Sequence, residues 1–374
     1  MDKQKIAIIG VKYWPSRGGV SRIVEDTVEL LKDYFEFTIY CYAHPMAATH
    51  MSGVNVIQIE EKKMGVVGVF NFYRECVNHA VRFGDYDLVH LHKIDAAYFL
   101  PALTQRYQVI ATSHESPYKR DKWSAITKQY FRAMERRFMN ADATLTSISK
   151  PLAEYYEKAY GRKVTYIPNG VDVHLTPNEA DARTILNKHD VKEPFIFFAA
   201  RRVMSTKGAH HLLDALKRLD YRGNVVIAGD TRQVPAYTRR LLEQAQGLNV
   251  HFIGYVAEKA TLMALVQLAE VFVFPSEVEG MSVMLLEVAS LGTPVIASDI
   301  EENTSIFDES ELLFFRSQDE ADLAQKLAWS FRHSKEMQQM AVRARRRVQT
   351  EYNRELISQR YAMLYRQGHP VMAR

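Results

Sequence analysis

Cysteine is scarce in this sequence, and long apolar runs are missing. The 374 residues include only two cysteines, Cys41 and Cys76, which excludes a disulfide framework and gives no cysteine spacing typical of a metal site. No stretch reaches the ~18 consecutive apolar residues that could cross a bilayer, and no apolar signal region follows the N-terminus. We therefore expect a cytoplasmic protein.

An excess of charge of one sign is also lacking. The chain has 48 basic and 44 acidic residues, a net charge of +4, which is too mild to indicate a nucleic-acid-binding protein. Its hydrophobic content of 47% and charged content of 25% are typical of a soluble globular protein. The length fits two domains of ordinary size.

Short β-branched or apolar runs alternate with helical patterns along the chain, which predicts an α/β protein with parallel sheets. Predicted strands of the first half lie at 5–10, 37–43, 55–60, 87–92, 108–114, 143–149 and 164–170. Those of the second half lie at 195–201, 224–230, 250–255, 271–276 and 294–298. Such sheets bind ligands outside the carboxyl ends of their strands, so functional residues are expected there.

The dinucleotide-binding fingerprint is missing, which bears on one alternative function. The first strand is not followed by G-x-G-x-x-G, and the second, FTIYCYAH, ends without an acidic residue that could hold a ribose. A nicotinamide-dependent oxidoreductase is therefore not favoured, although both halves have a Rossmann-like pattern.

The segment PSEVEGMSVMLLEVAS, residues 275–290, carries two glutamates in an unusual setting. Glu279 precedes a Gly-Met-Ser turn, and Glu287 lies on an apolar helix, where a carboxylate needs polar partners. Eight helical residues separate them by at most about 12 Å, a spacing that suits a sugar at Glu279 and a ribose diol at Glu287. Alternatively, Glu287 pairs with a core arginine and Glu279 lies in solvent, because this spacing alone is weak evidence.

Two cations follow the first strand of the second half. Arg202 and Lys207 lie between a strand and a helix, where they suit the phosphates of a nucleotide. The start of the helix after Glu279 offers backbone N–H groups to the same anion, with Ser282 as its predicted N-cap. The alternative is that both are solvated surface cations.

These motifs resemble the signature of family 4 glycosyltransferases, which are retaining enzymes of the GT-B fold. The resemblance covers nearly the whole chain and includes L-G-T-P-V-I-A-S after Glu287. Its other motifs are P-S-R-G-G at 15–19, I-P-N-G-V-D at 167–172, R-V-M-S-T-K-G at 202–208, I-A-G-D at 227–230 and F-I-G-Y-V at 252–256. It departs from the family at IEENTSIF, after 299, which leaves donor identity open, and at Met281-Ser282, which replaces an aromatic-Gly pair.

The resemblance implies two Rossmann-like domains that face each other across a cleft. The N-terminal acceptor domain would span 1–172 and be completed by a C-terminal helix within 353–374 that crosses back to it. The donor domain would span 173–352. Asp85-Tyr86-Asp87 precedes a strand and is interpreted as a turn, so no metal or other cofactor is predicted.

By the same resemblance, Glu279 contacts the donor sugar, Glu287 the ribose, and Arg202 and Lys207 the diphosphate. His114 corresponds to the active-site histidine of the N-terminal domain, although a lone histidine at a strand end is usually structural. The remaining predicted donor contacts are Gly18, Gly19, Tyr255, Val256, Gly280, Met281, Ser282 and Val283. Gly18 and Gly19 would let backbone approach the phosphates, or merely form a turn.

The implied function is transfer of a hexose from a nucleotide-diphospho-sugar to a hydroxyl of a glycan or lipid-linked glycan, in surface polysaccharide or glycolipid biosynthesis. UDP is the favoured nucleotide and GDP the second choice. A non-catalytic nucleotide-sugar-binding protein and a GT-B phosphorylase or epimerase are the alternatives. Segment 116–140 combines basic residues with an apolar stripe of Thr127, Phe131, Met134 and Phe138, which suits either an anionic membrane surface or a core-facing helix.

Overall fold

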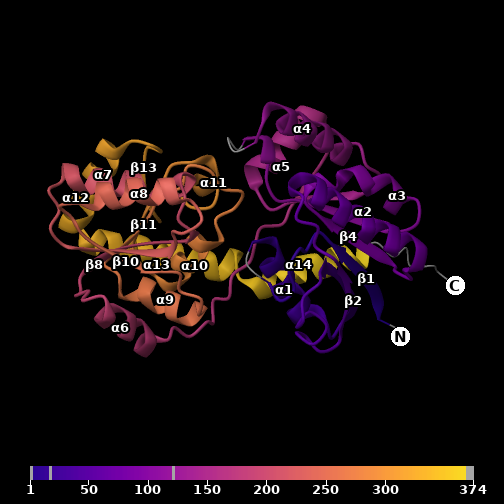
Figure 1. Ribbon diagram of the computed structural model, residues 1–374, viewed down its shortest axis with the longest axis horizontal. Coiled ribbons are helices and arrows are strands. Elements are labelled where there is room, and N and C mark those ends of the chain that lie inside the picture. Colours follow the sequence, from indigo (N-terminus) through magenta and orange to yellow (C-terminus); the bar gives the residue numbers. More distant parts are fainter. Residues whose placement is uncertain (1–2, 17–18, 120–122, 368–374) are drawn as a thin grey trace. The chain divides into compact units, whose positions relative to one another are not determined.

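A computed structural model describes residues 3–16, 19–119 and 123–367, and its chain divides into two compact units (Figure 1). The first contains Met1–Gly170 and Arg354–Arg374, and the second contains Val171–Asn353. Within the described ranges, every helix is too short or too polar to pass through a lipid bilayer.

The first unit is built on a parallel sheet of seven strands in the order β3-β2-β1-β4-β5-β6-β7. Its strands are β1 (Gln4–Ile9), β2 (Phe35–Tyr42), β3 (Val54–Ile59), β4 (Leu88–His92), β5 (Gln108–Ser113), β6 (Thr144–Ser147) and β7 (Thr165–Tyr166). The last is shorter than the predicted 164–170, because Pro168 has no N–H to continue the ladder.

Helices cover both faces of this sheet. They are α1 (Val20–Leu31), α2 (Gly65–Phe83), η1 (Ile94–Phe99), α3 (Leu100–Thr104), η2 (Pro117–Lys119), α4 (Ala125–Met139), α5 (Lys150–Tyr160) and α14 (Arg354–Gln367). Alternate residues of β1 face opposite sides, so Ile6 and Ile8 join one apolar cluster while Ala7 and Ile9 join the other.

The C-terminal helix α14 belongs to the first unit. Its Ile357, Tyr361 and Tyr365 are buried in the same cluster as β1 and α1. The ring of Tyr365 meets that of Phe35 edge to face, with centroids 5.5 Å apart. A helix that follows the second unit in the chain therefore completes the core of the first unit.

The second unit repeats the plan with six parallel strands in the order β10-β9-β8-β11-β12-β13. They are β8 (Phe195–Arg202), β9 (Asn224–Asp230), β10 (Asn249–Gly254), β11 (Val271–Phe274), β12 (Val295–Ser298) and β13 (Leu313–Phe315). The sequence did not predict β13, whose three residues are too few to show a strand pattern.

Nine helical segments accompany this second sheet among the described residues. They are α6 (Glu179–Lys188), η3 (Ser205–Lys207), α7 (Ala209–Arg218), α8 (Pro235–Ala245), α9 (Lys259–Leu268), α10 (Val283–Leu291), α11 (Glu301–Thr304), α12 (Glu320–Arg332) and α13 (Ser334–Glu351). Because β8 and β11 are paired and parallel, the loops that follow them leave from the same edge of the sheet. Of the predicted donor residues, Lys207, Glu279, Gly280, Met281 and Ser282 lie in those loops.

Candidate functional site

The loop that follows β8 packs closely against the loop that follows β11. Gly208 has φ +73°, and a Cβ added to it would lie 1.9 Å from the carbonyl oxygen of Pro275. The backbone N–H of Glu277 also donates to the carbonyl oxygen of Thr206, at 3.0 Å. Glycine at 208 is therefore required both by its backbone conformation and by the close approach of the second loop.

This contact brings Lys207 and Glu279 together. The Lys207 Nζ lies 2.5 Å from Glu279 Oε1, and the two side chains are 29% and 13% exposed. The sequence analysis assigned Lys207 to a phosphate and Glu279 to a sugar. In the structure, the two residues form an ion pair with each other. Glu279 is thus held in a partly buried ion pair, which corrects the alternative that placed it in solvent.

Arg202 is the last residue of β8 and is exposed. It lies opposite Asp230 in the parallel register of β8 and β9. Within the described part of the chain, its guanidinium makes no ion pair or hydrogen bond to another side chain. The structure therefore places Arg202 at the carboxyl edge of the sheet without joining it to the Lys207–Glu279 pair.

Helix α10 begins directly after this pair, with Gly280 half-buried and Met281 buried. Ser282 occupies the N-cap position but makes no capping hydrogen bond; its hydroxyl instead donates to Asn303 Oδ1 at 3.3 Å. The N–H of Val283 is also engaged, by Met281 O at 3.1 Å. Ser282 is therefore the N-cap by position, as predicted, but its side chain does not accept a hydrogen bond from the helix.

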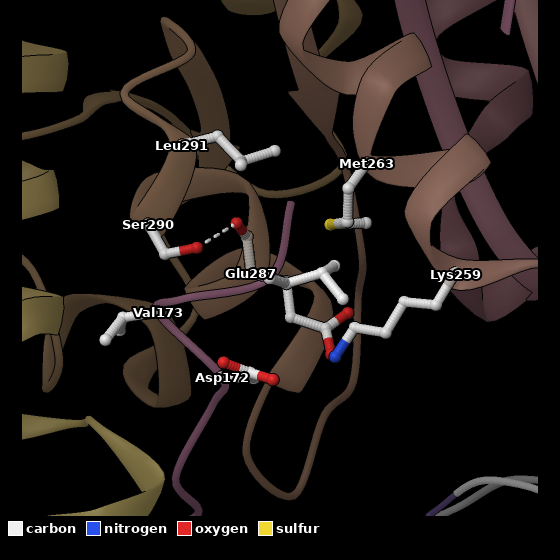
Figure 2. Close-up of a pocket in the computed structure, with 8 residues that line it drawn as sticks. Asp172, Val173, Lys259, Met263, Glu287, Ser290 and Leu291 are labelled. Atoms are coloured by element: carbon white, nitrogen blue, oxygen red, sulfur yellow. Dashed lines mark hydrogen bonds and ion pairs between the residues drawn. The ribbon is translucent and has the colours of Figure 1, made fainter. Parts of the chain in front are cut away.

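Glu287 lies on the second turn of α10 and is only 6% exposed. Its Oε1 is 2.8 Å from Nζ of Lys259, the first residue of α9. The carboxylate lines a small pocket together with Lys259 and the side chains of Asp172 and Met263 (Figure 2). The partner of the buried carboxylate is thus a lysine, whereas the sequence had offered a ribose or a core arginine.

Tyr255 and Val256 directly follow β10. Tyr255 is 53% exposed and Val256 is half-buried. The strand order places β10 two positions from β8, so both residues lie on the carboxyl edge that carries Arg202. No described contact joins either residue to Glu279 or Glu287.

In the first unit, His114 follows β5 and is buried beside another histidine. Its Nε2 is 2.9 Å from Nδ1 of His92, and burial lowers the pKa of His114 well below its ordinary value and that of His92 to about 3. His90 binds Thr112 Oγ1 through Nε2 and Tyr365 Oη through Nδ1, at 2.7 and 2.9 Å. All three rings are therefore uncharged at neutral pH.

Of the two glycines predicted at the start of α1, Gly18 lies outside the described residues. Gly19 is the N-cap of α1, with φ +62° and ψ −140°. A Cβ at this position would meet no atom within 4 Å, so its backbone conformation alone accounts for the glycine.

The apolar stripe predicted in 116–140 faces the core. Phe131, Met134 and Phe138 of α4 are buried, and Met134 and Phe138 belong to a core cluster. Thr127 is half-buried. Of the two interpretations that the sequence left open for this stripe, packing into the protein is the correct one.

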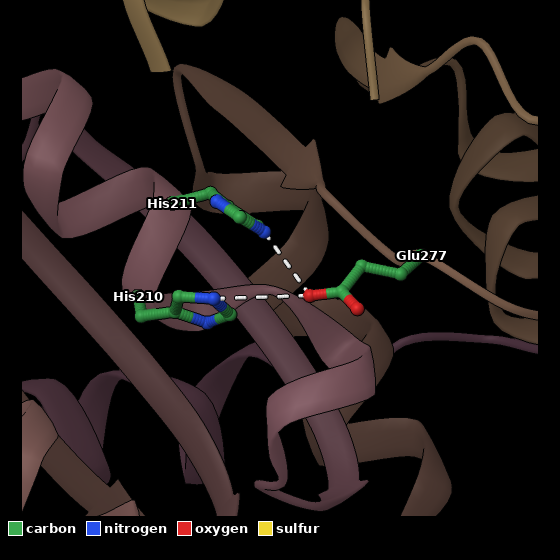
Figure 3. Close-up of side chains that lie close together, drawn as sticks. All are labelled: His210, His211 and Glu277. Atoms are coloured by element: carbon green, nitrogen blue, oxygen red, sulfur yellow. Dashed lines mark hydrogen bonds and ion pairs between the residues drawn. The ribbon is translucent and has the colours of Figure 1, made fainter. Parts of the chain in front are cut away.

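Four residues of the second unit were not singled out from the sequence. Lys259 had no recognisable signal, because a lysine at a helix start is ordinary. His210, His211 and Glu277 form a cluster (Figure 3), and their only sequence signal is the paired histidine that follows Lys207-Gly208.

Comparison with known proteins agrees with this architecture. Residues 181–347 match the family described as Glycosyl transferases group 1, and residues 17–175 match Glycosyltransferase Family 4. The D-rhamnosyltransferase WbpZ of Pseudomonas aeruginosa is 31% identical over 297 residues, which cover 75% of this chain and 72% of that protein.

A phosphatidyl-myo-inositol mannosyltransferase of Mycobacterium tuberculosis is 26% identical over 241 residues, which cover 61% of this chain and 59% of that protein. Among solved structures, Anabaena Alr3699/HepE in complex with UDP and glucose superposes with a TM-score of 0.79 and 18% identity. The match covers 97% of this chain and all of that one (100%). At that identity the likeness concerns the fold.

Proposed function

The chain belongs to the family 4 glycosyltransferases of the GT-B fold, and from this premise we propose that it is a retaining, metal-independent hexosyltransferase. The donor is a nucleotide-diphospho-sugar, with UDP favoured over GDP. The acceptor is a hydroxyl of a glycan or lipid-linked glycan in surface polysaccharide or glycolipid biosynthesis. The WbpZ and mannosyltransferase relatives support a glycan or lipid acceptor, and the complex of Alr3699/HepE with UDP supports the choice of nucleotide.

The observation that carries this proposal is the ion pair between Lys207 and Glu279 at the start of α10. Cleavage of the bond to the sugar builds negative charge on the β-phosphate, and a fixed ammonium lowers the free energy of that state. Glu279 holds Lys207 in place at 2.5 Å and keeps a second oxygen for the sugar hydroxyls. Arg202 adds a second positive charge on the same edge of the sheet.

The ribose is proposed to bind at Glu287. Its carboxylate is buried, but it lines a pocket and is paired with Lys259, and a carboxylate of this kind can accept two hydrogen bonds from a diol. Gly280, Met281, Ser282 and Val283 lie between the two glutamates, where their backbone would contact the diphosphate. Tyr255 and Val256 are proposed to flank the base.

Retention follows if the acceptor attacks from the face that the nucleotide leaves. The departing phosphate oxygen then takes the acceptor's proton, and no protein base is required. His114 is uncharged and held through Nε2 by His92, so its proposed role is to bind a sugar hydroxyl rather than to transfer a proton. Gly18 and Gly19 would contribute backbone from the first unit.

Contact with an anionic membrane is proposed through α4. Since its apolar stripe is buried, the contact would depend on exposed basic residues, among them Arg132 and Arg136, and on Ile126, which is 84% exposed. Electrostatic attachment of this kind weakens as salt screens the charges. Flotation with phosphatidylserine vesicles at low salt tests this: protein that stays at the bottom of the gradient contradicts membrane attachment.

The central experiment is a donor screen. UDP-, GDP- and ADP-hexoses are incubated with the protein in EDTA, and nucleoside diphosphate release is measured together with the anomeric configuration of the product. We expect release from one donor and retention of configuration. Binding of a donor by thermal shift without any turnover, in the presence of glycan acceptors, would indicate the non-catalytic alternative.

A further inference from the structure

Two adjacent histidines and a glutamate of the second unit direct their side chains toward one point (Figure 3). His210 and His211 lie in the first turn of α7, and Glu277 lies in the loop between β11 and α10. Glu277 Oε1 is 3.1 Å from Nε2 of His211 and 3.7 Å from Nε2 of His210. The three side chains are only 8–19% exposed.

The opposite ring nitrogens of both histidines are already engaged. His211 Nδ1 is 2.6 Å from Glu320 Oε1, and His210 Nδ1 is 2.9 Å from Tyr237 Oη. A metal-binding histidine commonly donates its second ring N–H to a carboxylate or other oxygen, which orients the ring. Here Tyr237 and Glu320 contact the Nδ1 atoms, so the rings are oriented with their Nε2 atoms toward Glu277.

The spacing of the three donor atoms fits a metal ion. In a tetrahedral site with bonds of about 2.0–2.2 Å, neighbouring ligand atoms lie about 3.3–3.6 Å apart. The observed separations of 3.1 and 3.7 Å bracket this range, and all three atoms lie within 4.8 Å of one another. Two imidazole nitrogens and a carboxylate oxygen suit Zn²⁺ and its neighbours, whereas Mg²⁺ and Ca²⁺ prefer oxygen alone.

We propose that His210, His211 and Glu277 bind one divalent transition-metal ion, with Zn²⁺ as the best fit, and that Glu320 orients the site. The charges favour a cation, because Glu277 and Glu320 are both acidic and lie against the histidines, while Arg240 and Arg218 oppose them in part.

Such an ion would cross-link the first turn of α7 to the loop between β11 and α10. Glu277 is two residues from Glu279, and His210 is three residues from Lys207, so the ion would stiffen the two loops that carry the ion pair. It would have a structural role apart from the diphosphate. Metal binding does not depend on the proposed transferase activity, and it is measured without a donor.

The test is a titration of chelator-treated protein with Co²⁺, whose visible absorption reports coordination geometry. We expect one Co²⁺ per chain, with absorption bands that Zn²⁺ abolishes and Mg²⁺ leaves unchanged. Glu277→Gln and His210→Asn should remove the bands, and Glu320→Gln should weaken binding by about 10–100-fold, as expected for a group that orients a ligand. The matched control is His174→Gln, an exposed histidine, which should bind as the original protein does.

Two results would overturn the proposal. The first is the absence of visible bands in the original protein, which would mean that the three side chains only contact one another and do not bind a metal. The second is unchanged binding in both Glu277→Gln and His210→Asn, which would place the ion elsewhere. Circular dichroism of the metal-free variants shows that they are folded; if His210→Asn is not, Glu277→Gln decides the matter by itself.

Discussion

The ammonium of Lys207 lies 2.5 Å from the carboxylate of Glu279, although 72 residues separate them in the chain. The pair exists because Gly208 lets the loop after β8 press against Pro275. The residue proposed to stabilise the leaving phosphate is therefore positioned by the residue proposed to hold the sugar.

Loss of either member of this pair should slow transfer. A single charged group that acts on the departing phosphate contributes about 10²–10³-fold in kcat, so we expect Lys207→Ala and Glu279→Gln each to lower kcat at least about 100-fold. The measurement is nucleotide release with the true donor. Lys217→Ala removes an exposed lysine from the other end of α7 and should have no effect; full activity of either site variant argues against the assigned roles.

Substitution of Gly208 should cost more stability than substitution of another glycine with positive φ. Gly161→Ala, at φ +63° with nothing within 4 Å, should lose about 1 kcal/mol from backbone conformation alone. Gly208→Ala has the same conformational cost and adds the overlap with Pro275 O, so we expect a loss of about 2–4 kcal/mol. Urea unfolding of the two variants measures the difference, and equal losses would mean that the loops can separate at no cost.

Glu287 should affect donor binding more than catalysis. A hydrogen bond to a charged group is worth about 1.5–3 kcal/mol, so Glu287→Gln should raise the donor KM about 10–100-fold with a smaller change in kcat. Lys259→Met removes the partner and leaves the carboxylate in place. If Glu287 serves only the ion pair, both variants will lose stability and neither will change KM.

Acid should destabilise the first unit through its buried histidines. Burial lowers the pKa of His92 to about 3 and those of His90 and His114 well below 6.5. As the pH falls, these histidines are therefore protonated in the unfolded chain before they are protonated in the folded protein. The free energy of unfolding should therefore fall as pH drops from about 6.5 toward 3, and His92 alone should contribute a loss of about 1.6 kcal/mol between pH 6.5 and 5.

Urea unfolding at pH 7.5, 6 and 5 measures this dependence. His92→Gln should unfold with a smaller change across the range, whereas the exposed His174→Gln should match the original protein. A pH dependence that is the same in all three proteins would show that other groups dominate acid unfolding.

The sequence predicted the architecture well because parallel strands buried on both faces are continuous apolar runs. KIAIIG and NVVIAGD are recognisable as strands without any knowledge of their neighbours. The short β13 and the ends of strands were less predictable, since a strand of three residues has no periodicity and Pro168 limits β7 through its missing N–H.

At the candidate site, the sequence could single out residues but could not predict their partners. Glu279 and Lys207 stand in recognisable motifs, yet their pairing depends on how two loops meet across the sheet edge. Ser282 is the N-cap residue that the sequence predicted, but the hydrogen bond that its hydroxyl donates to Asn303 of α11 could not be predicted. The meeting of His210 and His211 with Glu277 depends on the same loop contact, which no local pattern reveals.

The place of α14 has a consequence for synthesis on the ribosome. Tyr361 and Tyr365 cover apolar side chains of β1 and β2, yet they emerge more than 300 residues after those strands. Until α14 has been synthesised, Phe35 and Phe37 lack the cover of Tyr361 and Tyr365, so we expect part of their apolar surface to be exposed to water. We expect a chaperone to bind this exposed apolar surface of the nascent chain. Premature termination near residue 350 would leave the same surface exposed in the released protein.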